Sequence, residues 1–167
     1  MKLKRGSSIR LKFDCRQHLF VVLLCCCLLA AAYAVRAEAF EFTDDAGAKI
    51  ALDKPPQRVV SLVPSATETI FALRASERLK GVTAHSDQPA AVHTKQLVGG
   101  YLAPCVQKIE ELDPDMVIAS SLHNQVRKHF ADSQTKVITL RTESIEDSFR
   151  EILLLGRIFD RNKAAAT

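Results

Sequence analysis

The sequence predicts an α/β domain in which helices cover both faces of a mostly parallel sheet, giving three layers. The first observation is the stretch 58–73, where an apolar, β-branched run ends at Pro64 and becomes a helical pattern. The second is that short apolar runs and helical patterns alternate from there onward. Strands that alternate with helices form parallel sheets, because each helix carries the chain back to the start of the next strand.

Residues 1–37 have the pattern of a secretory signal peptide. Basic residues precede an apolar run at 19–34, and small residues follow it. This run of about 16 residues is shorter than the ~20 that a membrane-spanning helix needs, so a leader is favoured over a membrane anchor. Cleavage is expected between Ala34 and Phe40, with 32–34, 35–37 and 37–39 as alternative sites, which implies export to the periplasm. A lipoprotein is disfavoured, because no small residue precedes Cys25.

Removal of the leader changes the charge of the protein. Residues 1–37 hold seven of the 23 Lys and Arg residues and one of the 19 Asp and Glu residues, so the remainder carries 16 basic and 18 acidic side chains. The resulting net charge of −2 gives no support to nucleic-acid binding. Cys105 is the one cysteine of the sequence outside the leader, so it has no partner for a disulfide within the remainder.

Residues 38–57 are predicted to form a hairpin and a stiff connector. Two alternating runs within 40–52 flank the turn-forming residues 44–47. Pro55 and Pro56 follow, and proline stiffens the chain because its ring fixes one backbone dihedral and restricts the preceding residue.

The stretch 58–73 reads as a strand, a tight turn and a helix. Its apolar strand residues suit a strand that is buried on both faces. Ser65 and Glu68 have the spacing of a capping box, which predicts that the helix begins at Ser65. Ligands of open α/β sheets bind beyond the carboxyl ends of the strands, so the turn at Pro64 and Ser65 is expected to face a ligand.

The later segments continue the alternation. Strands are predicted at 79–83, 96–98, 116–120 and 136–140, and helices at 105–112, 124–132 and 144–159. Ser144, with Asp147 in the first turn, gives the last of these helices a capped start. Periodicity predicts a core made of Val59, Val60, Leu62, Ile70, Phe71, Val82, Val117, Ile118, Val137, Ile138, Ile152, Leu153 and Leu155.

The sequence carries no recognised catalytic pattern. Ser65 lacks the Gly-x-Ser-x-Gly context of a hydrolase nucleophile, and no phosphate loop or dinucleotide fingerprint is found. A small secreted hydrolase is therefore a minor alternative, and no cofactor is expected. Exposed or helix-end histidines are expected rather than a metal site, because no ligand-like spacing joins any two of His85, His93, His123 and His129.

Taken in order, these motifs resemble the periplasmic substrate-binding proteins of ABC importers for cobalamin, haem and ferric siderophores. The resemblance rests on Arg58-Val59-Val60-Ser61-Leu62, Pro64-Ser65-Ala66-Thr67-Glu68, Gly81-Val82-Thr83, Val98-Gly99-Gly100-Tyr101 and Pro114-Asp115-Met116-Val117-Ile118. Proteins of that class bind ligand between two lobes that one long helix joins. The resemblance implies that 58–159 form the N-terminal lobe, one half of a two-lobe protein, that 160–167 begin the interlobe helix, and that the second lobe is missing.

The resemblance also implies where a ligand would bind. The implied contact positions are Ser65, His85, Tyr101, His123 and Asn124. The family places an aromatic side chain at the position of Tyr101, which faces the corrin in the cobalamin branch and ligates iron in the haem branch. Ala103 stands where the haem branch has Arg, which favours a corrinoid over haem or a ferric siderophore. His85 replaces an aromatic residue of the cobalamin branch, so this preference is slight. An ordinary surface aromatic is the alternative role of Tyr101.

The partners implied are the small-molecule ligand and the permease subunits of an importer. Docking on the permease in this family uses a surface Glu, but Gln107 stands at that position, with Glu110 and Glu111 within one turn as substitutes. Arg74 replaces a Gly after the first helix, at a cost of ~1 kcal/mol if the left-handed turn is kept. A truncated, non-functional fragment is thus the alternative to a working binding protein, and a single lobe is expected to bind ligand weakly.

Overall fold

The computed structural model describes residues 39–166, so the leader predicted at 1–37 lies outside the described residues. Within them the main sheet has five strands in the order β5-β4-β3-β6-β7, and each neighbouring pair is parallel. The strands are β3 (Val59–Ser61), β4 (Leu79–Val82), β5 (Gln96–Leu97), β6 (Met116–Ala119) and β7 (Lys136–Thr139). The predicted α/β fold with a mostly parallel sheet is confirmed.

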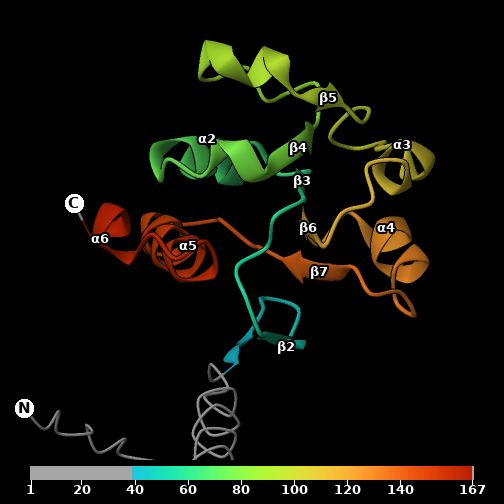
Figure 1. Cartoon of the computed structure of the whole chain (residues 1–167). Coiled ribbons are helices and arrows are strands. Elements are labelled where there is room, and N and C mark those ends of the chain that lie inside the picture. The colour runs from blue at the N-terminus through green and yellow to red at the C-terminus, as the bar shows by residue number, and fades with distance from the viewer. Residues whose placement is uncertain (1–38, 167) are drawn as a thin grey trace, which may run out of the picture. The chain divides into compact units, whose positions relative to one another are not determined.

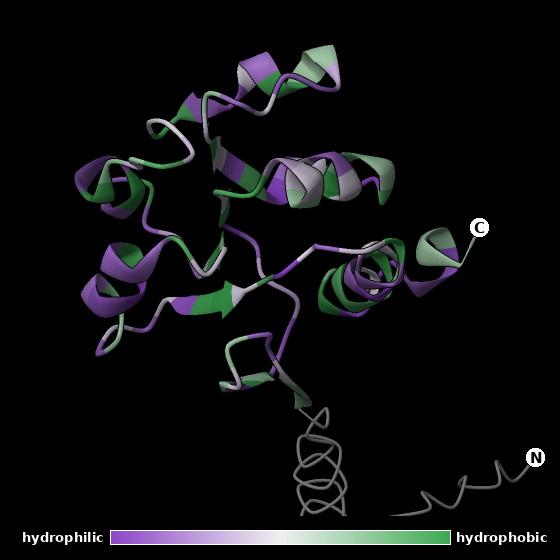
Figure 2. Ribbon diagram, turned by 180° about the vertical axis from the view of Figure 1, so that it is seen from behind, coloured by the Kyte–Doolittle hydropathy of each residue, from purple (hydrophilic) through white to green (hydrophobic). Residues whose placement is uncertain are grey.

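Helices cover both faces of this sheet, as Figure 1 shows with the sheet seen along its edge. One face carries α2 (Pro64–Ala72), α5 (Ile145–Ile158) and α6 (Asn162–Ala165), and the other carries α3 (Val106–Glu110) and α4 (Asn124–His129). Each face has its own apolar core, the first including Ile70 and Leu155 and the second Ile109 and Val126. Figure 2 shows that these helices carry both apolar and hydrophilic residues. These are the predicted three layers.

The hairpin predicted at 40–52 is confirmed. Strands β1 (Phe40–Thr43) and β2 (Lys49–Leu52) pair antiparallel. Asp44 in the turn is buried, and its carboxylate accepts backbone N–H bonds from Ala46 at 3.0 Å, Ala48 at 2.8 Å and Thr139 at 2.9 Å. Because Thr139 belongs to β7, the Asp44 side chain both forms the turn and fastens the hairpin to the main sheet.

The predicted start of α2 at Ser65 is wrong. The helix begins at Pro64, its N-cap residue is Val63, and no side chain caps it. Proline suits the first helical position, because its missing N–H would have had no partner there and its fixed dihedral is already helical. The capped start of α5 is confirmed, since Ser144 accepts the backbone N–H of Asp147 at 3.0 Å.

Most of the predicted core is buried, but Leu153 is 53% exposed and that prediction is wrong. Helix α5 turns Glu151, Leu155 and Ile158 inward. Leu153 lies two positions from Leu155, about 200° around the helix, and therefore faces outward. Phe71, Val137 and Ile152 are only half-buried. The predicted core residues that are buried are Val59, Val60, Leu62, Ile70, Val82, Val117, Ile118, Ile138 and Leu155.

Several connections differ from the predicted pattern. Helices α3 and α4 are shorter than the predicted 105–112 and 124–132, and two 3₁₀ helices, Ser76–Arg78 and Ala90–Thr94, were not predicted. Arg74 ends α2 with φ of 56°, so the left-handed turn is kept despite the missing glycine. No helix in 39–166 has the length and apolar character needed to cross a membrane.

Candidate functional site

The loops that follow the parallel strands open along one edge of the sheet, because parallel strands share their carboxyl ends. Ser65 follows β3, His85 follows β4, Tyr101 follows β5, and His123 follows β6. Three of the five predicted ligand-contact positions, His85, Tyr101 and His123, therefore come from loops after strands. Ser65 and Asn124 lie in the first turns of α2 and α4. What these side chains can do depends on their own contacts.

Tyr101, Ser120 and His123 form a connected group, here called the Tyr101 cluster. The Tyr101 hydroxyl donates to Ser120 Oγ at 3.3 Å, and its ring meets the His123 imidazole edge to face, with centroids 5.2 Å apart. His123 Nε2 lies 2.7 Å from the backbone oxygen of Tyr101. Tyr101 is half-buried. Its ring is thus held at the edge of the sheet by contacts on its hydroxyl, its face and its backbone.

The hydrogen bonds of His123 define its protonation state. Its Nδ1 accepts the backbone N–H of Ser120 at 2.9 Å, so the ring proton must be on Nε2, which donates to Tyr101. The side chain is buried, with 2% exposed. Burial lowers the pKa of His123 below its ordinary value, as does the nearby Arg127 guanidinium, while the hydrogen bond to the Tyr101 carbonyl opposes this. His123 is therefore a neutral side chain that positions the Tyr101 loop.

A glycine makes the Tyr101 loop possible. Gly99 has φ of 114°, a conformation that side chains rarely allow. A Cβ at this position would lie 2.9 Å from both the Ala103 oxygen and the Cys105 nitrogen. The loop closes on itself through a bridge between Gly99 and Pro104, which projects Tyr101 beyond the strand.

The remaining predicted ligand positions are exposed. His85 lies next to the loop, with its Nδ1 3.5 Å from the Tyr101 backbone nitrogen, a long contact that leaves the ring accessible. Asn124 instead uses its side-chain oxygen to accept a bond from Arg127 at 2.8 Å within α4. The structure therefore brings His85, Tyr101 and His123 together, whereas the side chain of Asn124 is engaged within its own helix.

A second polar group, here called the Glu151 cluster, consists of Ser65, Thr142 and Glu151 on the opposite face of the sheet. The Thr142 hydroxyl donates to Glu151 Oε2, and the Ser65 hydroxyl lies 3.4 Å from the same oxygen. Burial raises the pKa of Glu151 above its ordinary value, although these two hydroxyls oppose the shift. Sequence reasoning missed Glu151, but its spacing from Leu155 and Ile158 placed it on the buried face of α5.

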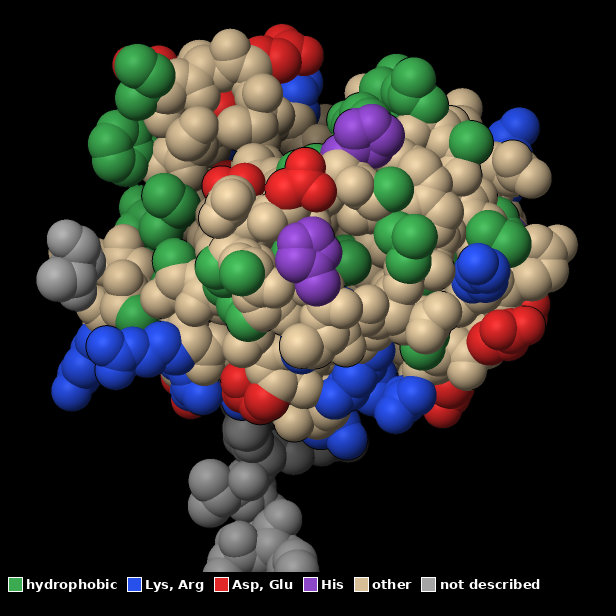
Figure 3. Space-filling view, turned by 90° about the horizontal axis from the view of Figure 1, so that it is seen from above, with side chains coloured by type: hydrophobic (Ala, Val, Ile, Leu, Met, Phe, Trp, Pro, Cys, Tyr) green, Lys and Arg blue, Asp and Glu red, His purple; other side chains and the backbone are tan. Residues whose placement is uncertain are grey.

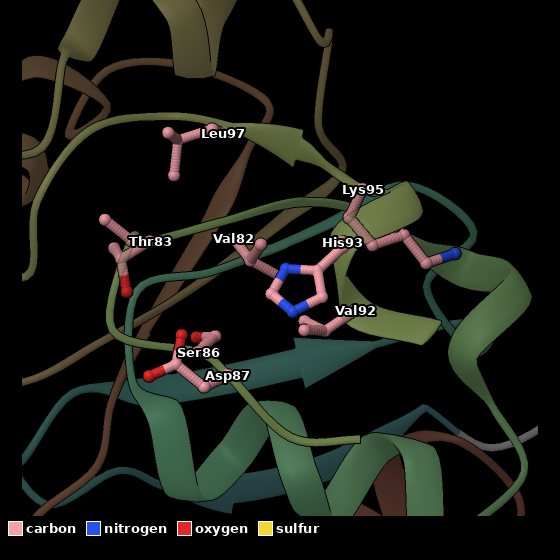
Figure 4. A pocket seen from close by; sticks show the side chains of 9 residues that line it. Val82, Thr83, Ser86, Asp87, Val92, His93, Lys95 and Leu97 are labelled. Carbon is pink, nitrogen blue, oxygen red and sulfur yellow. The ribbon is translucent and has the colours of Figure 1, made fainter. Parts of the chain in front are cut away.

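A pocket of about 270 Å³ is lined by residues within 82–87 and 92–97 (Figure 4). Its walls combine apolar residues with Thr83, Ser86, Asp87 and His93, and the buried Thr83 hydroxyl has no hydrogen-bond partner. Lys95 lines the wall, but its ammonium group runs away from the pocket and donates to the Ser76 carbonyl at 2.6 Å. Burial and the charge of Lys80 lower the pKa of Lys95.

The predicted docking residues lie on α3 and just beyond it. Gln107, Glu110 and Glu111 are exposed, and Glu110 lies 3.5 Å from His129 Nε2 of α4. The Cys105 thiol contacts the Gln107 side-chain oxygen at 3.6 Å. Among residues 39–166, no group of three His, Cys, Asp or Glu side chains could hold a metal ion.

The charges show no single-sign surface on the face that Figure 3 presents. Acidic and basic side chains there are interspersed with apolar and uncharged ones. On this face of the described part there is no continuous basic stripe of the kind that follows a nucleic-acid backbone.

Comparisons with known proteins point to one family. The family described as periplasmic binding protein matches residues 59–167. An uncharacterized ABC transporter substrate-binding lipoprotein of Bacillus subtilis is 30% identical over 137 residues, covering 78% of this chain and 43% of that protein. A vitamin B12-binding protein of Pectobacterium carotovorum is 30% identical over 117 residues, covering 67% of this chain and 42% of that protein.

Comparison with solved structures points to the same family. The crystal structure of a periplasmic heme binding protein from Pseudomonas aeruginosa superposes with a TM-score of 0.63 at 26% identity, covering 68% of this chain and 41% of that one. The chain thus spans less than half the length of these relatives. The matched part of the solved structure corresponds to one lobe of a longer protein.

Proposed function

Because the chain belongs to the periplasmic binding protein family, we propose that it serves as a solute-binding component of an ABC importer. The family consists of solute-binding proteins rather than enzymes. The proposed ligand is a corrinoid or a related metal chelate, such as haem or a ferric siderophore. The described lobe supplies one wall of the binding cleft.

The observation that carries this proposal is the restrained aromatic ring of Tyr101 at the carboxyl edge of the sheet. Its hydroxyl, ring and backbone are each held by Ser120 or His123, so little freedom remains to be lost on binding. A half-buried aromatic face of this kind suits the flat, apolar surface of a macrocycle. The neighbouring His85 supplies an exposed polar group beside it.

Titration calorimetry with cobalamin, haem and a ferric siderophore tests the proposal. We expect one of the three to bind the purified protein, and we expect Tyr101→Ala to weaken that binding about tenfold or more, since loss of a buried aromatic contact costs over 1 kcal/mol. Phe149→Ala is the matched control, because Phe149 is an aromatic residue of α5 that is 64% exposed. Equal losses from the two variants would contradict the placement of the site.

The alternative of a truncated, non-functional fragment is judged by the same titration. No binding of any of the three ligands, with the protein folded and the Tyr101 loop intact by NMR, would favour that alternative. Submicromolar binding would contradict the expectation that a single lobe binds weakly.

We also propose that the protein is exported and that its α3 surface meets the permease. Gln107, Glu110 and Glu111 are exposed there, and Glu110 lies 3.5 Å from His129 Nε2. N-terminal sequencing of the protein recovered from the periplasm tests export, and cleavage between Ala34 and Phe40 is the expected result. An intact Met1 in the cytosolic fraction would contradict it. Glu111→Arg should weaken transport in cells without changing ligand affinity.

A further inference from the structure

Glu151 is unusual among the acidic side chains of residues 39–166, because it is only 5% exposed and lacks a cationic or N–H partner in the hydrogen bonds of its carboxyl group. Its Oε2 is approached by the hydroxyls of Ser65 and Thr142, while its Oε1 is buried without any hydrogen-bond partner. Asp44, the other buried carboxylate of the described residues, receives three backbone N–H bonds. Glu151 is thus built into a different environment.

This environment favours the neutral carboxylic acid. Burial of an ionised carboxylate costs several kcal/mol unless charged or N–H donors compensate, and two hydroxyls compensate only in part. Protonation of the carboxyl group removes this charge. The same geometry accounts for the raised pKa of Glu151.

One charged group on a neighbouring element acts in the same direction. Asp45 of the hairpin turn disfavours a negative charge on Glu151, although Arg150 partly neutralises Asp45 at 3.2 Å. Arg150 also forms an ion pair with Asp147 on α5, with 2.8 Å between the two charged groups. From helix α2, the Ser65 hydroxyl faces the Glu151 carboxyl group, while the Glu68 side chain of that helix is exposed. The loop residues Arg141 and Glu143 beside Thr142 are exposed as well.

We propose that Glu151 is a proton-dependent positioning residue: it joins the Ser65 turn of α2 to Thr142 in the loop after β7, and a change in its protonation changes the strength of this junction. The two segments are far apart in sequence, but both lie at the carboxyl edge of the sheet, where a ligand is proposed to bind. The junction is a property of the fold, whereas its effect on ligand affinity rests on the proposed function.

The first test is an NMR titration of the Glu151 side-chain carboxyl carbon in the purified protein, with Glu151→Gln to assign the signal. The expected midpoint lies above that of an ordinary Glu, and the backbone amide shifts of Ser65 and Thr142 should follow the same midpoint. A midpoint at or below the ordinary value overturns the proposal. So does a raised midpoint that neither amide follows. Neither result depends on whether a ligand is found.

The second test is urea unfolding at pH 4.5 and pH 7. Because the folded state holds the proton more tightly, the wild-type protein should lose stability as pH rises through the folded-state pKa. Glu151→Gln mimics the neutral acid, so at pH 7 its unfolding constant should be about threefold or more below that of the wild type. The matched control Glu143→Gln changes an exposed carboxylate of the same loop and should have no such effect. An equal loss of stability in Glu151→Gln at both pH values would overturn the proposal.

Discussion

The Tyr101 cluster and the Glu151 cluster lie at the same edge of the sheet, on opposite faces, and they satisfy their polar atoms in different ways. In the Tyr101 cluster both nitrogens of the buried imidazole have directed partners. In the Glu151 cluster one carboxyl oxygen has none. A fully satisfied polar network is rigid and specific, whereas a buried polar atom without a partner is costly, most of all when it carries a charge. The comparison assigns ring positioning to one cluster and proton sensitivity to the other.

The two clusters also have opposite pH dependence. The pKa of His123 is lowered, so the folded state prefers the neutral imidazole, and stability is lost as pH falls from the ordinary histidine value through the folded-state pKa. The pKa of Glu151 is raised, so stability is lost as pH rises from the ordinary glutamate value through the folded-state pKa.

The largest expected effect comes from breaking the Tyr101 cluster with His123→Ala. The substitution leaves the Ser120 N–H and the Tyr101 carbonyl without their partners. We expect the free energy of unfolding to fall by about 2–4 kcal/mol, since an unsatisfied buried group costs about 1–3 kcal/mol. Urea denaturation measures this, with His129→Ala as the control at a side chain that is 41% exposed. Similar small losses in both variants would show that the cluster is not a rigid unit.

A more selective change is His123→Asn, which keeps a hydrogen-bond acceptor for the Ser120 N–H but removes the titratable imidazole. The Asn side-chain oxygen can occupy the place of Nδ1 and accept the Ser120 N–H, but it does not bind a proton in this range. The acid-side loss of stability seen in the wild type should therefore be reduced, whatever the change in stability at pH 7. Urea midpoints measured from pH 7 down to pH 5 test this. An unchanged slope would assign the acid response to other groups.

The elements of the fold could be read from the sequence because their signals are local. The central strands are buried on both faces, so apolar runs such as 59–63 and 116–119 marked them directly. The start of α2 could not be read in the same way, because Pro64 and Ser65 both signal a helix start. The Ser65 hydroxyl contacts Glu151 instead of capping the helix, and the local sequence does not show this contact. Local signals therefore found the strands and the main helices, but they misplaced several helix boundaries and missed two 3₁₀ helices.

Some residues that carry the family resemblance stabilise the fold instead of lining the candidate site. The Arg58 guanidinium donates to the carbonyls of Leu112 and Asp113, and Asp115 accepts the backbone N–H groups of Gln57 at 2.6 Å and Arg58 at 3.0 Å. These bonds join the amino ends of β3 and β6, the edge opposite the site. Such motifs predict the lobe well, but they carry no information about the ligand.

The two polar clusters could be predicted only in part. Tyr101 and His123 are 22 residues apart, and sequence reasoning named both without their mutual hydrogen bond. Glu151 was missed because a charged residue in a helix usually faces water. Its partners come from α2 and from the loop after β7, so a contact between distant segments, rather than any local pattern, makes it distinctive.

A smaller effect is expected from Thr142→Val, which removes the hydroxyl nearest to Glu151. The loss should be about 1 kcal/mol, the usual value of one hydrogen bond, and it should be greater at pH 7 than at pH 4.5, because an ionised carboxylate depends more on its donor. Thr135→Val is the matched control, since its hydroxyl donates at 2.8 Å to a neutral acceptor, the Pro114 carbonyl. A loss that is equal at both pH values would argue against proton sensitivity at Glu151.

The smallest expected effect on stability is that of Ser65→Ala, and it separates two roles of this residue. Ser65 is exposed and its hydroxyl lies 3.4 Å from Glu151 Oε2, so the free energy of unfolding should change by less than about 0.5 kcal/mol. The hydroxyl nevertheless favours the ionised form of Glu151, and its removal should move the midpoint of the Glu151 NMR titration upward. If the midpoint rises while ligand affinity at acid pH is unchanged, Ser65 acts through Glu151. If affinity falls and the midpoint stays, Ser65 contacts the ligand directly, as the family resemblance implies.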